Sequence, residues 1–292
     1  MSRVVILGAT GMLGSTVYDV LKDRHELVLV VRDKRKLALL DKAYGKVDKH
    51  KSIEFDAEKV HEDFLANNGY SRNYLSSFLE QLGEFDYAIN AIGIINRSSA
   101  ENEALTLFIN GALPHILARE WGYKLIHIST DCAFNGIEGA PYDEDAPKTP
   151  SDLYGLSKSI GEPTNCLTIR TSIIGRELEG FKSLLEWFLH QEGQELRGFS
   201  NHLWNGITAK QFGRICDQII QNPGLYPRTG IYHVFSDVVS KYGMLLGFKN
   251  KFNVDCTILE DSEPKLNRTL ATKKELNSKL NIPSFSEMLS DL

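Results

Sequence analysis

Tyr154 and Lys158 stand four positions apart in the stretch "YGLSK", and both side chains can take part in proton transfer. On a helix, residues at this spacing share one face. A neighbouring ammonium favours the phenolate, so Lys158 is expected to lower the pKa of Tyr154 and let it exchange a proton near neutral pH. The same spacing is frequent by chance on exposed helices, so the pair needs support from its surroundings.

That support comes from "ISTDC", where an apolar run ends in Ser129, Thr130 and Asp131 and is followed by Cys132. Ligands of open α/β sheets bind outside the carboxyl ends of the strands. Thr130, 24 positions before Tyr154, is therefore expected at the edge of the sheet where a ligand binds. Cys132 could be a packing residue, a metal ligand or a catalytic group.

A glycine pattern follows the first apolar run, "RVVIL", and opens a helical stretch. Glycines allow a tight turn and a close approach to a pyrophosphate, and the helix N-terminus offers N–H groups to the anion. The context predicts dinucleotide binding rather than an ordinary tight turn. The predicted contacts are Gly8, Thr10, Gly11, Met12, Leu13 and Gly14.

The end of the second apolar run indicates which dinucleotide is bound. Arg32 stands where an acidic residue would select NAD, and a guanidinium suits the 2′-phosphate of NADP(H). NAD(H) stays open because Asp33 could still serve the ribose. Asp56 is expected either to contact the adenine or to cap a helix. Small residues that let a cofactor lie flat end the fourth run, at Asn90, Ala91, Ile92 and Gly93.

Six short, β-branched apolar runs position these groups, at 3–8, 26–31, 51–55, 86–93, 124–129 and 166–170. They alternate with helical patterns, clearest at 12–22, 100–120 and 152–162. This alternation predicts an α/β fold with a Rossmann-like, doubly wound parallel sheet. We expect residues 1–173 to form the nucleotide-binding domain, with 207–222 packing back on it. Residues 174–292 are expected to form a smaller C-terminal substrate lobe.

Composition limits the function classes. The 292 residues carry a net charge of −5, which disfavours nucleic acid as a partner. No signal peptide and no apolar run long enough for a bilayer are evident, so we expect a cytoplasmic protein without membrane contact. The four cysteines form no C-x-x-C pair, and the eight histidines have no ligand spacing, so we predict no metal.

Taken together, GATGMLG, NAIG, STD-x-x-F-x-G, Y-x-x-x-K and "LTIRTSIIG" resemble the extended short-chain dehydrogenase/reductases. More narrowly, "STDCAFNG" followed by "PYDED" and "YGLSKSIGE" is similar to the dTDP-4-dehydrorhamnose reductase group. "LLEWFLHQEG" and "LWNGIT" resemble a branch that includes reductases of UDP-2-acetamido-2,6-dideoxy-hexos-4-uloses. The resemblance covers most of residues 1–175.

This resemblance implies roles for the site residues. Tyr154 would give a proton to the C4 carbonyl oxygen, and Lys158 would bind the nicotinamide ribose. Thr130, with Ser129 as its substitute, would hydrogen-bond the carbonyl. Asn110 matches the position that organises a proton-relay water, although it could simply be a polar residue near a helix end. The resemblance also implies a nucleotide-sugar substrate and allows a homodimer.

Cys132 departs from the reductase pattern, which has tyrosine there. Sugar 4,6-dehydratases carry glutamate at this place, and a thiol is a poor substitute for it. GDP-fucose synthases carry a cysteine that acts as the base of an epimerisation. Cys132 could therefore remove the proton at C3, or it could pack as a small apolar residue. The acid on the opposite ring face would come from Lys182, His190 or His202.

The sequence thus predicts an NADPH-dependent 4-keto reductase of a nucleoside-diphosphate 4-keto-6-deoxy sugar, with 3-epimerisation left open. Asp131, Lys182, Trp204 and Asn205 are the predicted substrate contacts, and Trp204 could equally belong to the core. Two alternatives remain. One is an epimerase that retains its cofactor, and the other is a non-catalytic NADP-binding regulatory subunit.

Overall fold

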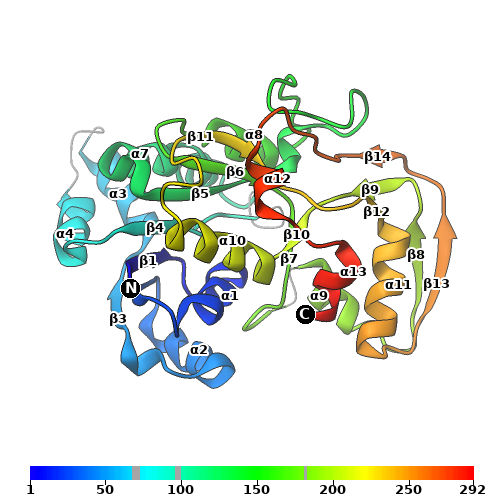
Figure 1. The fold of residues 1–292 in the computed structure, drawn as a ribbon, viewed down its shortest axis with the longest axis horizontal. Coiled ribbons are helices and arrows are strands. Elements are labelled where there is room, and N and C mark those ends of the chain that lie inside the picture. The colour runs from blue at the N-terminus through cyan, green and yellow to red at the C-terminus, as the bar shows by residue number, and fades with distance from the viewer. Residues whose placement is uncertain (68–72, 96–99, 181–182) are drawn as a thin grey trace.

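The centre of the protein is a seven-stranded sheet in the order β11-β6-β5-β4-β1-β2-β3, seen in a computed structural model that describes residues 1–67, 73–95, 100–180 and 183–292 (Figure 1). All neighbouring strands of this sheet run parallel. The strands are β1 Arg3–Leu7, β2 Glu26–Val31, β3 Lys51–Glu54, β4 Tyr87–Asn90, β5 Leu125–Thr130, β6 Leu167–Thr171 and β11 Gly230–His233. The predicted doubly wound α/β sheet is confirmed.

Both faces of the sheet are buried, which explains why the strands are apolar throughout rather than alternating. In β1, Val4 and Ile6 join one core cluster, while Val5 and Leu7 join the other. The helices that contribute to the first cluster are α1 Met12–Leu21, α2 Leu37–Tyr44, α10 Ala209–Gln221 and α12 Leu276–Leu280. The second cluster includes α3 Ala57–Ala66, α4 Asn73–Leu82 and α7 Leu113–Trp121.

Two further helical segments bring side chains toward the end of β5. The predicted helix over 100–120 is α6 Glu103–Thr106, a π-helical turn η3 Leu107–Ala112 and then α7. Helix α8, Leu153–Ile160, follows a long loop and packs against both η3 and the short helix η5, Asp131–Ala133.

The smaller part of the molecule has its own core (Figure 1). It contains α9 Leu184–Leu189, α11 Lys241–Phe252 and α13 Phe285–Ser290. Strand β8, Glu195–Phe199, pairs with β13, Thr257–Asp261. Three short strands form a second sheet in the order β12-β9-β14, with bounds Val239–Ser240, His202–Trp204 and Leu266–Asn267. Strands β7 Ile173–Ile174 and β10 Ile207–Thr208 form a parallel pair.

The chain does not divide at one point into two domains. Helix α10 lies against α1 (Figure 1). Strand β11 lies in the main sheet beside β6, so the expected substrate lobe of residues 174–292 also supplies a strand to that sheet. Among the described residues, no helix is long and apolar enough to cross a bilayer.

Candidate active site

The loop from Gly8 to Gly14 has the shape of a phosphate cradle. Gly8 has φ of 76°, a value that favours glycine. A Cβ on Gly14 would lie 2.1 Å from the Gly8 carbonyl oxygen, so the loop and the first turn of α1 touch only because Gly14 lacks a side chain. Gly11 caps α1 without a side-chain hydrogen bond. The helix N-terminus is therefore left for an anion such as a pyrophosphate.

The loop after β4 lies directly beside this cradle. A Cβ on Gly8 would meet the carbonyl oxygen of Ala91 at 3.2 Å and Cγ1 of Ile92 at 3.3 Å. Asn90 holds the turn, because its Oδ1 accepts from the N–H of Ile92 at 3.1 Å and its Nδ2 lies 3.1 Å from His127 Nδ1. The predicted residues 8–14 and 90–93 are thus brought together.

Arg32 is exposed directly after β2, and its guanidinium makes no hydrogen bond or ion pair with the described residues. Asp33 is instead paired with Arg35, whose hydrogen bonds hold the pKa of this carboxyl at about 2. Arg32 is therefore free to meet a 2′-phosphate. Asp56 caps α3 by accepting from the N–H of Glu58 at 3.0 Å, so its carboxylate has the structural role of the two that were expected.

Tyr154 and Thr130 meet because α8 approaches the end of β5 very closely. A Cβ on Gly155 would lie 2.2 Å from the carbonyl oxygen of Cys132, so only glycine allows this approach. Asp152 caps α8 by accepting from the N–H of Gly155 at 2.7 Å. Thr130 in turn accepts from the N–H of Cys132 at 3.1 Å, which fixes η5 against the strand.

The pKa of Tyr154 is shifted in the direction opposite to the prediction. Burial raises it most, ionisation of Cys132 or Asp131 would raise it further, and hydrogen bonding with Thr130 lowers it only in part. The phenol therefore stays protonated at neutral pH, as the donor in a carbonyl reduction must be.

Lys158 is almost fully buried and donates to the backbone carbonyl of Ile128 at 2.7 Å. Burial lowers its pKa to about 8, and the Glu162 carboxylate opposes that shift. The ammonium thus lies under the end of β5, on the helix that carries Tyr154.

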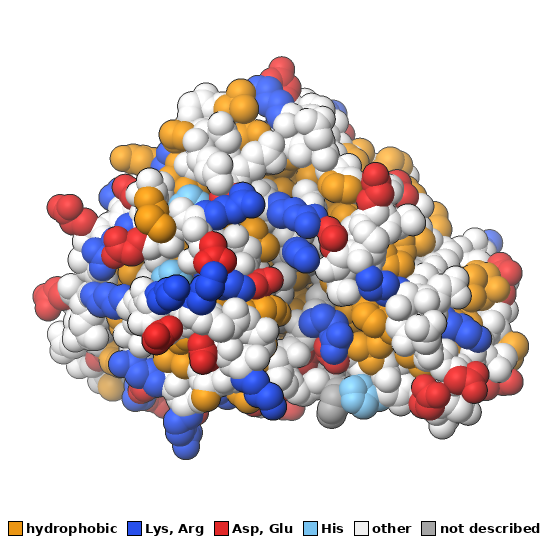
Figure 2. Space-filling model, turned by 60° about the horizontal axis from the view of Figure 1, so that its bottom comes forward, with side chains coloured by type: hydrophobic (Ala, Val, Ile, Leu, Met, Phe, Trp, Pro, Cys, Tyr) orange, Lys and Arg blue, Asp and Glu red, His pale blue; other side chains and the backbone are white. Residues whose placement is uncertain are grey.

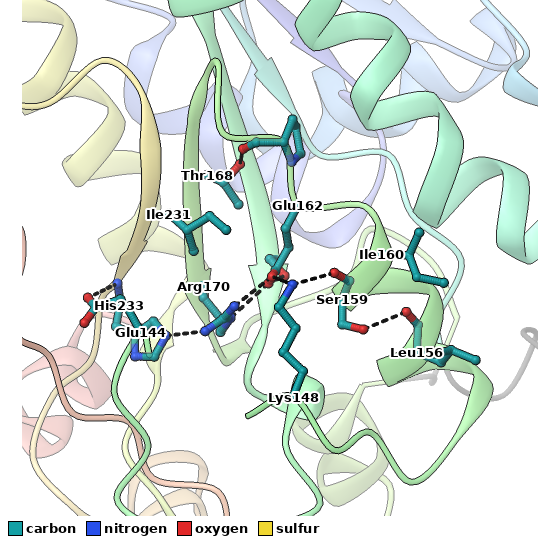
Figure 3. Close-up of polar contacts among 12 residues, drawn as sticks. Glu144, Lys148, Leu156, Ser159, Ile160, Glu162, Thr168, Arg170, Ile231 and His233 are labelled. Carbon is teal, nitrogen blue, oxygen red and sulfur yellow. Dashed lines mark hydrogen bonds and ion pairs between the residues drawn. The ribbon is translucent and has the colours of Figure 1, made fainter. Parts of the chain in front are cut away.

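A buried ionic cluster anchors the same strand (Figure 3). The Glu162 carboxylate accepts from Arg170 Nε and Nη2 at 2.9 and 2.7 Å and lies 2.6 Å from Lys148 Nζ. Ser129 Oγ donates to the same carboxylate at 2.5 Å, so this hydroxyl is engaged away from Thr130. Arg170 also contacts His233 of β11 at 2.6 Å. Burial alone would raise the pKa of Glu162, but the hydrogen bonds and charge of Arg170 hold it below its usual value.

Asn110 lies in the π-helical turn and ties three segments together. Its Oδ1 accepts from the N–H of Ile94, and its Nδ2 donates to the Ile94 carbonyl, each at 2.9 Å. The same Nδ2 lies 3.1 Å from Ser157 Oγ on α8. Its side-chain amide thus fixes the loop after β4 to α8, while its predicted part in a water relay stays a prediction.

Cys132 is half-buried, and Arg268 Nη1 lies 3.4 Å from its sulfur. Burial raises the pKa of the thiol to about 12, and the nearby Asp131 carboxylate adds to the shift more than Arg268 offsets it. At neutral pH the group is a thiol rather than a thiolate.

The predicted substrate contacts lie in different surroundings, and most are already engaged within the protein. Asp131 is buried beside Thr130, at 3.2 Å from its hydroxyl, and burial raises the pKa of this carboxyl. Trp204 packs edge-on against Phe285 in the core of the smaller part. Both amide atoms of Asn205 bond to the backbone of Leu270 at 2.9 Å, so neither is free to read a base.

The three candidates for an acid opposite Cys132 also differ. Lys182 lies outside the described residues. His190 ends α9 and contacts the carbonyl of Glu186 at 2.8 Å. His202 lies in β9, where burial and the charge of Lys241 lower its pKa to about 4, so it is neutral at pH 7.

Sequence reasoning missed four residues that shape the site. Gly155 and Glu162 stand within the "YGLSKSIGE" stretch already singled out, so the motif contained their signal. Lys241 begins α11 directly after β12, and Arg268 follows β14. Both stand far along the chain, and no sequence pattern marks them. Among the described residues, no group of three or more His, Cys, Asp or Glu side chains could hold a metal ion.

Comparison with known proteins agrees with this architecture. The family model described as "RmlD substrate binding domain" matches residues 2–290. The spore coat polysaccharide biosynthesis protein SpsK of Bacillus subtilis is 28% identical over 212 residues, which are 69% of this chain and 70% of that protein. A dTDP-4-dehydrorhamnose reductase of Burkholderia thailandensis is 30% identical over 140 residues, 44% of this chain and 43% of that protein.

Solved structures share the whole fold. The dTDP-4-dehydrorhamnose reductase of Bacillus anthracis, in complex with NADP, has a TM-score of 0.70 at 18% identity over 99% of this chain and 98% of that one. The UDP-N-acetylglucosamine 4-epimerase of Methanobrevibacter ruminantium has a TM-score of 0.71 at 13% identity, covering 99% and 96%. At these identities the likeness concerns the fold, which reductases and epimerases share.

Proposed function

Because the chain belongs to the RmlD substrate binding domain family, we propose that it is an NADPH-dependent reductase of a nucleoside-diphosphate 4-keto-6-deoxy sugar. The observation that carries this proposal is a protonated, half-buried Tyr154 beside Thr130, on the helix that also holds Lys158. Relatives named dTDP-4-dehydrorhamnose reductase support the reaction class. The relative SpsK, named for polysaccharide biosynthesis, supports a product that enters glycan synthesis.

The chain's own residues suit the cofactor. When bound, NADPH would supply the hydride. The N-terminus of α1 and the Gly8–Gly14 loop would hold its pyrophosphate, and Arg32 would meet its 2′-phosphate. Activated sugars and NADPH are cytoplasmic metabolites, so we place the reaction in the cytoplasm.

The proton that accompanies the hydride would come from the side chains of the protein. Thr130 and Tyr154 would both hydrogen-bond the C4 carbonyl oxygen of the sugar, and Tyr154 would give it a proton as negative charge develops there. The Lys158 ammonium would stabilise the phenolate that remains. Its anchor on Ile128 and the charge of Glu162 keep it in place and favour its protonated form.

We further propose that reduction proceeds without epimerisation at C3. A base must be ionised to take a proton, and burial keeps Cys132 in its thiol form at neutral pH. The neutral His202 would also be a weak acid on the other side. Packing is therefore the better supported role for Cys132.

The decisive experiment measures NADPH oxidation with dTDP- and UDP-4-keto-6-deoxy sugars, with and without a 2-acetamido group, in deuterated water. We expect oxidation, a reduced C4 in the product and no deuterium at C3. If deuterium appears at C3 with wild type but not with the Cys132→Ser variant, Cys132 would be the base of a 3-epimerisation. Sugar conversion without net NADPH oxidation would favour an epimerase that retains its cofactor. NADPH binding without conversion of any of these sugars would favour a regulatory subunit.

A further inference from the structure

His127 is a buried histidine of β5 to which the proposed reduction gives no role. None of its surface is exposed. In the main sheet it is the register partner of Asn90 in β4 and of Thr168 in β6, so the three side chains lie on one face of the sheet. A buried polar side chain costs free energy unless its hydrogen bonds are satisfied, so the contacts of this imidazole indicate what it does.

The contacts of Asn90 determine which nitrogen of His127 carries the proton. The backbone N–H of Ile92 can only donate, and it meets Asn90 Oδ1 at 3.1 Å. The Nδ2 group of the same amide then faces His127 Nδ1, also at 3.1 Å. Because this NH₂ group can only donate, Nδ1 must accept, and the ring proton must be on Nε2. A ring protonated on both nitrogens would set two donors against each other.

The surroundings of His127 favour this neutral ring. Burial lowers its pKa well below the ordinary value, and the charge of Lys158 adds to that shift. Its Nε2 is buried and has no hydrogen-bond partner among the described residues. A buried N–H without a partner costs free energy that an apolar side chain would not. The contact through Nδ1 is therefore what the imidazole contributes at this position.

Asn90 extends this contact to the loop after β4, which lies beside the glycine loop. A Cβ on Gly8 would meet the carbonyl oxygen of Ala91 at 3.2 Å and Cγ1 of Ile92 at 3.3 Å, so a small movement of Ile92 would change the space at the Gly8 turn. Lys and Arg side chains flank a surface hollow between the larger and smaller parts of the molecule, which suits the entry of an anion such as NADPH (Figure 2). Because His127 has no exposed surface, it would act on such a ligand through Asn90 rather than by contact.

We propose that His127 is a positioning residue for NADPH: through Nδ1 it holds the Asn90 amide in the orientation that fixes residues 90–93 against the glycine loop. The inference rests on the cofactor of the proposed function and is independent of which sugar is reduced. The loop after β4 would then support the nicotinamide half of NADPH. The adenosine half would be held by the glycine loop and Arg32, which His127 does not position.

Calorimetric titration with NADPH and with adenosine 2′,5′-bisphosphate, which lacks the nicotinamide half, tests this role without requiring turnover. We expect His127→Leu to weaken NADPH binding about tenfold, because the Asn90 amide loses its acceptor. Binding of the bisphosphate should change much less, whereas a general loosening of the fold would weaken both ligands alike. The matched control is Thr168→Val, which removes a buried hydroxyl that donates to the Pro163 carbonyl at 2.7 Å, on the side of His127 away from Asn90. It should bind both ligands like wild type.

Two further substitutions separate the acceptor from the volume of the ring. In His127→Asn the amide oxygen is bonded to Cγ, as Nδ1 is, so it can still accept from Asn90. In His127→Gln the oxygen stands one carbon further out, near the place of Nε2. We expect His127→Asn to retain more NADPH affinity than His127→Gln, although it fills less of the buried space. If His127→Leu fails to fold, this comparison carries the same test.

A double-mutant cycle shows whether His127 acts through Asn90. If it does, His127→Leu should cost little further NADPH affinity once Asn90→Ala has removed the amide. Additive losses in the double variant would overturn the inference, and so would equal losses for NADPH and the bisphosphate. Wild-type protein that binds no NADPH would overturn it together with the proposed function. The expected pattern of NADPH binding, with no 4-keto sugar reduced by wild type, would uphold the role of His127 and remove the proposed reductase function.

Discussion

The ammonium of Lys158 on α8 donates a hydrogen bond to the backbone carbonyl of Ile128 in β5, at 2.7 Å. This contact joins the helix that carries Tyr154 to the strand that ends in Thr130. It also holds a lysine in a buried place, where the charged form is less favourable than in water. Tyr154 and Thr130 are thus held together by Lys158, the residue whose charge the proposed proton transfer needs.

This burial predicts a fall of activity in mild alkali. The pKa of Lys158 is lowered to about 8, so the ammonium loses its proton as the pH rises through that value. We expect kcat/KM for sugar reduction to fall above this pH by about tenfold per pH unit. The measurement is a pH–rate profile, with NADPH affinity followed in parallel as the control. A rate that stays level well above this pH would contradict the role given to Lys158.

Removal of the Tyr154 hydroxyl should abolish proton donation and leave the fold intact. We expect Tyr154→Phe to lower kcat by about a hundredfold to ten-thousandfold, the usual range for a general acid. NADPH binding, followed by quenching of tryptophan fluorescence, should match wild type because the glycine loop is untouched. Retention of most of the activity would exclude Tyr154 as the proton donor.

The glycine loop should not accept a methyl group. In Gly14→Ala the new Cβ would lie 2.1 Å from the Gly8 carbonyl oxygen, so the backbone of the loop must move. We expect loss of NADPH binding and a lower melting temperature. Gly224→Ala is the control, because a Cβ there meets no atom within 4 Å. Equal NADPH affinity in the two variants would disprove the cradle.

Arg32 should decide between NADPH and NADH. Arg32→Gln should weaken NADPH binding at least about tenfold and leave NADH binding nearly unchanged, because only NADPH carries the 2′-phosphate. Arg35→Gln serves as the comparison, since Arg35 is already paired with Asp33. The observable is the ratio of the two dissociation constants, and an unchanged ratio in Arg32→Gln would assign selectivity to another residue.

The Glu162–Arg170 pair should matter far more to stability than an exposed pair. Glu162→Gln leaves a buried guanidinium without its anion, which costs about 3–5 kcal/mol in comparable cases. Glu275→Gln removes the partner of Lys279 in an exposed pair, where water screens the charges and little stability should be lost. Denaturant unfolding of both variants gives the comparison, and similar losses would mean that water reaches the cluster.

The main features of the fold could be predicted from the sequence, and Tyr154 and Lys158 could be placed on one helix, because both depend on local patterns. The runs that form β1 to β6 are apolar and short, and the glycine loop follows the first of them. The general rule for open parallel sheets then places the Gly8 turn after β1 and Thr130 at the end of β5 along the same edge of the sheet.

Other features depend on contacts between distant segments. "GIYHVF" reads as a strand, but nothing local indicates that it pairs with β6. The pKa of Tyr154 depends on burial among Cys132 and Asp131 rather than on its spacing from Lys158. Arg268 looks like a surface cation until the register of β14 with β9 places it beside Cys132.

The position of β11 has a consequence for attempts to divide the protein. The chain leaves the main sheet after β6, builds α9, β8 and β9 of the smaller part, returns as α10 and β11, and leaves again to build β12, α11, β13 and β14 before α12. A fragment that stops at residue 173 would lack the edge strand of its sheet and the helix that covers α1. The smaller part, in turn, is connected through several crossings instead of one hinge. Neither half is a separable module, and swapping substrate lobes between related enzymes would require two matched grafts rather than one.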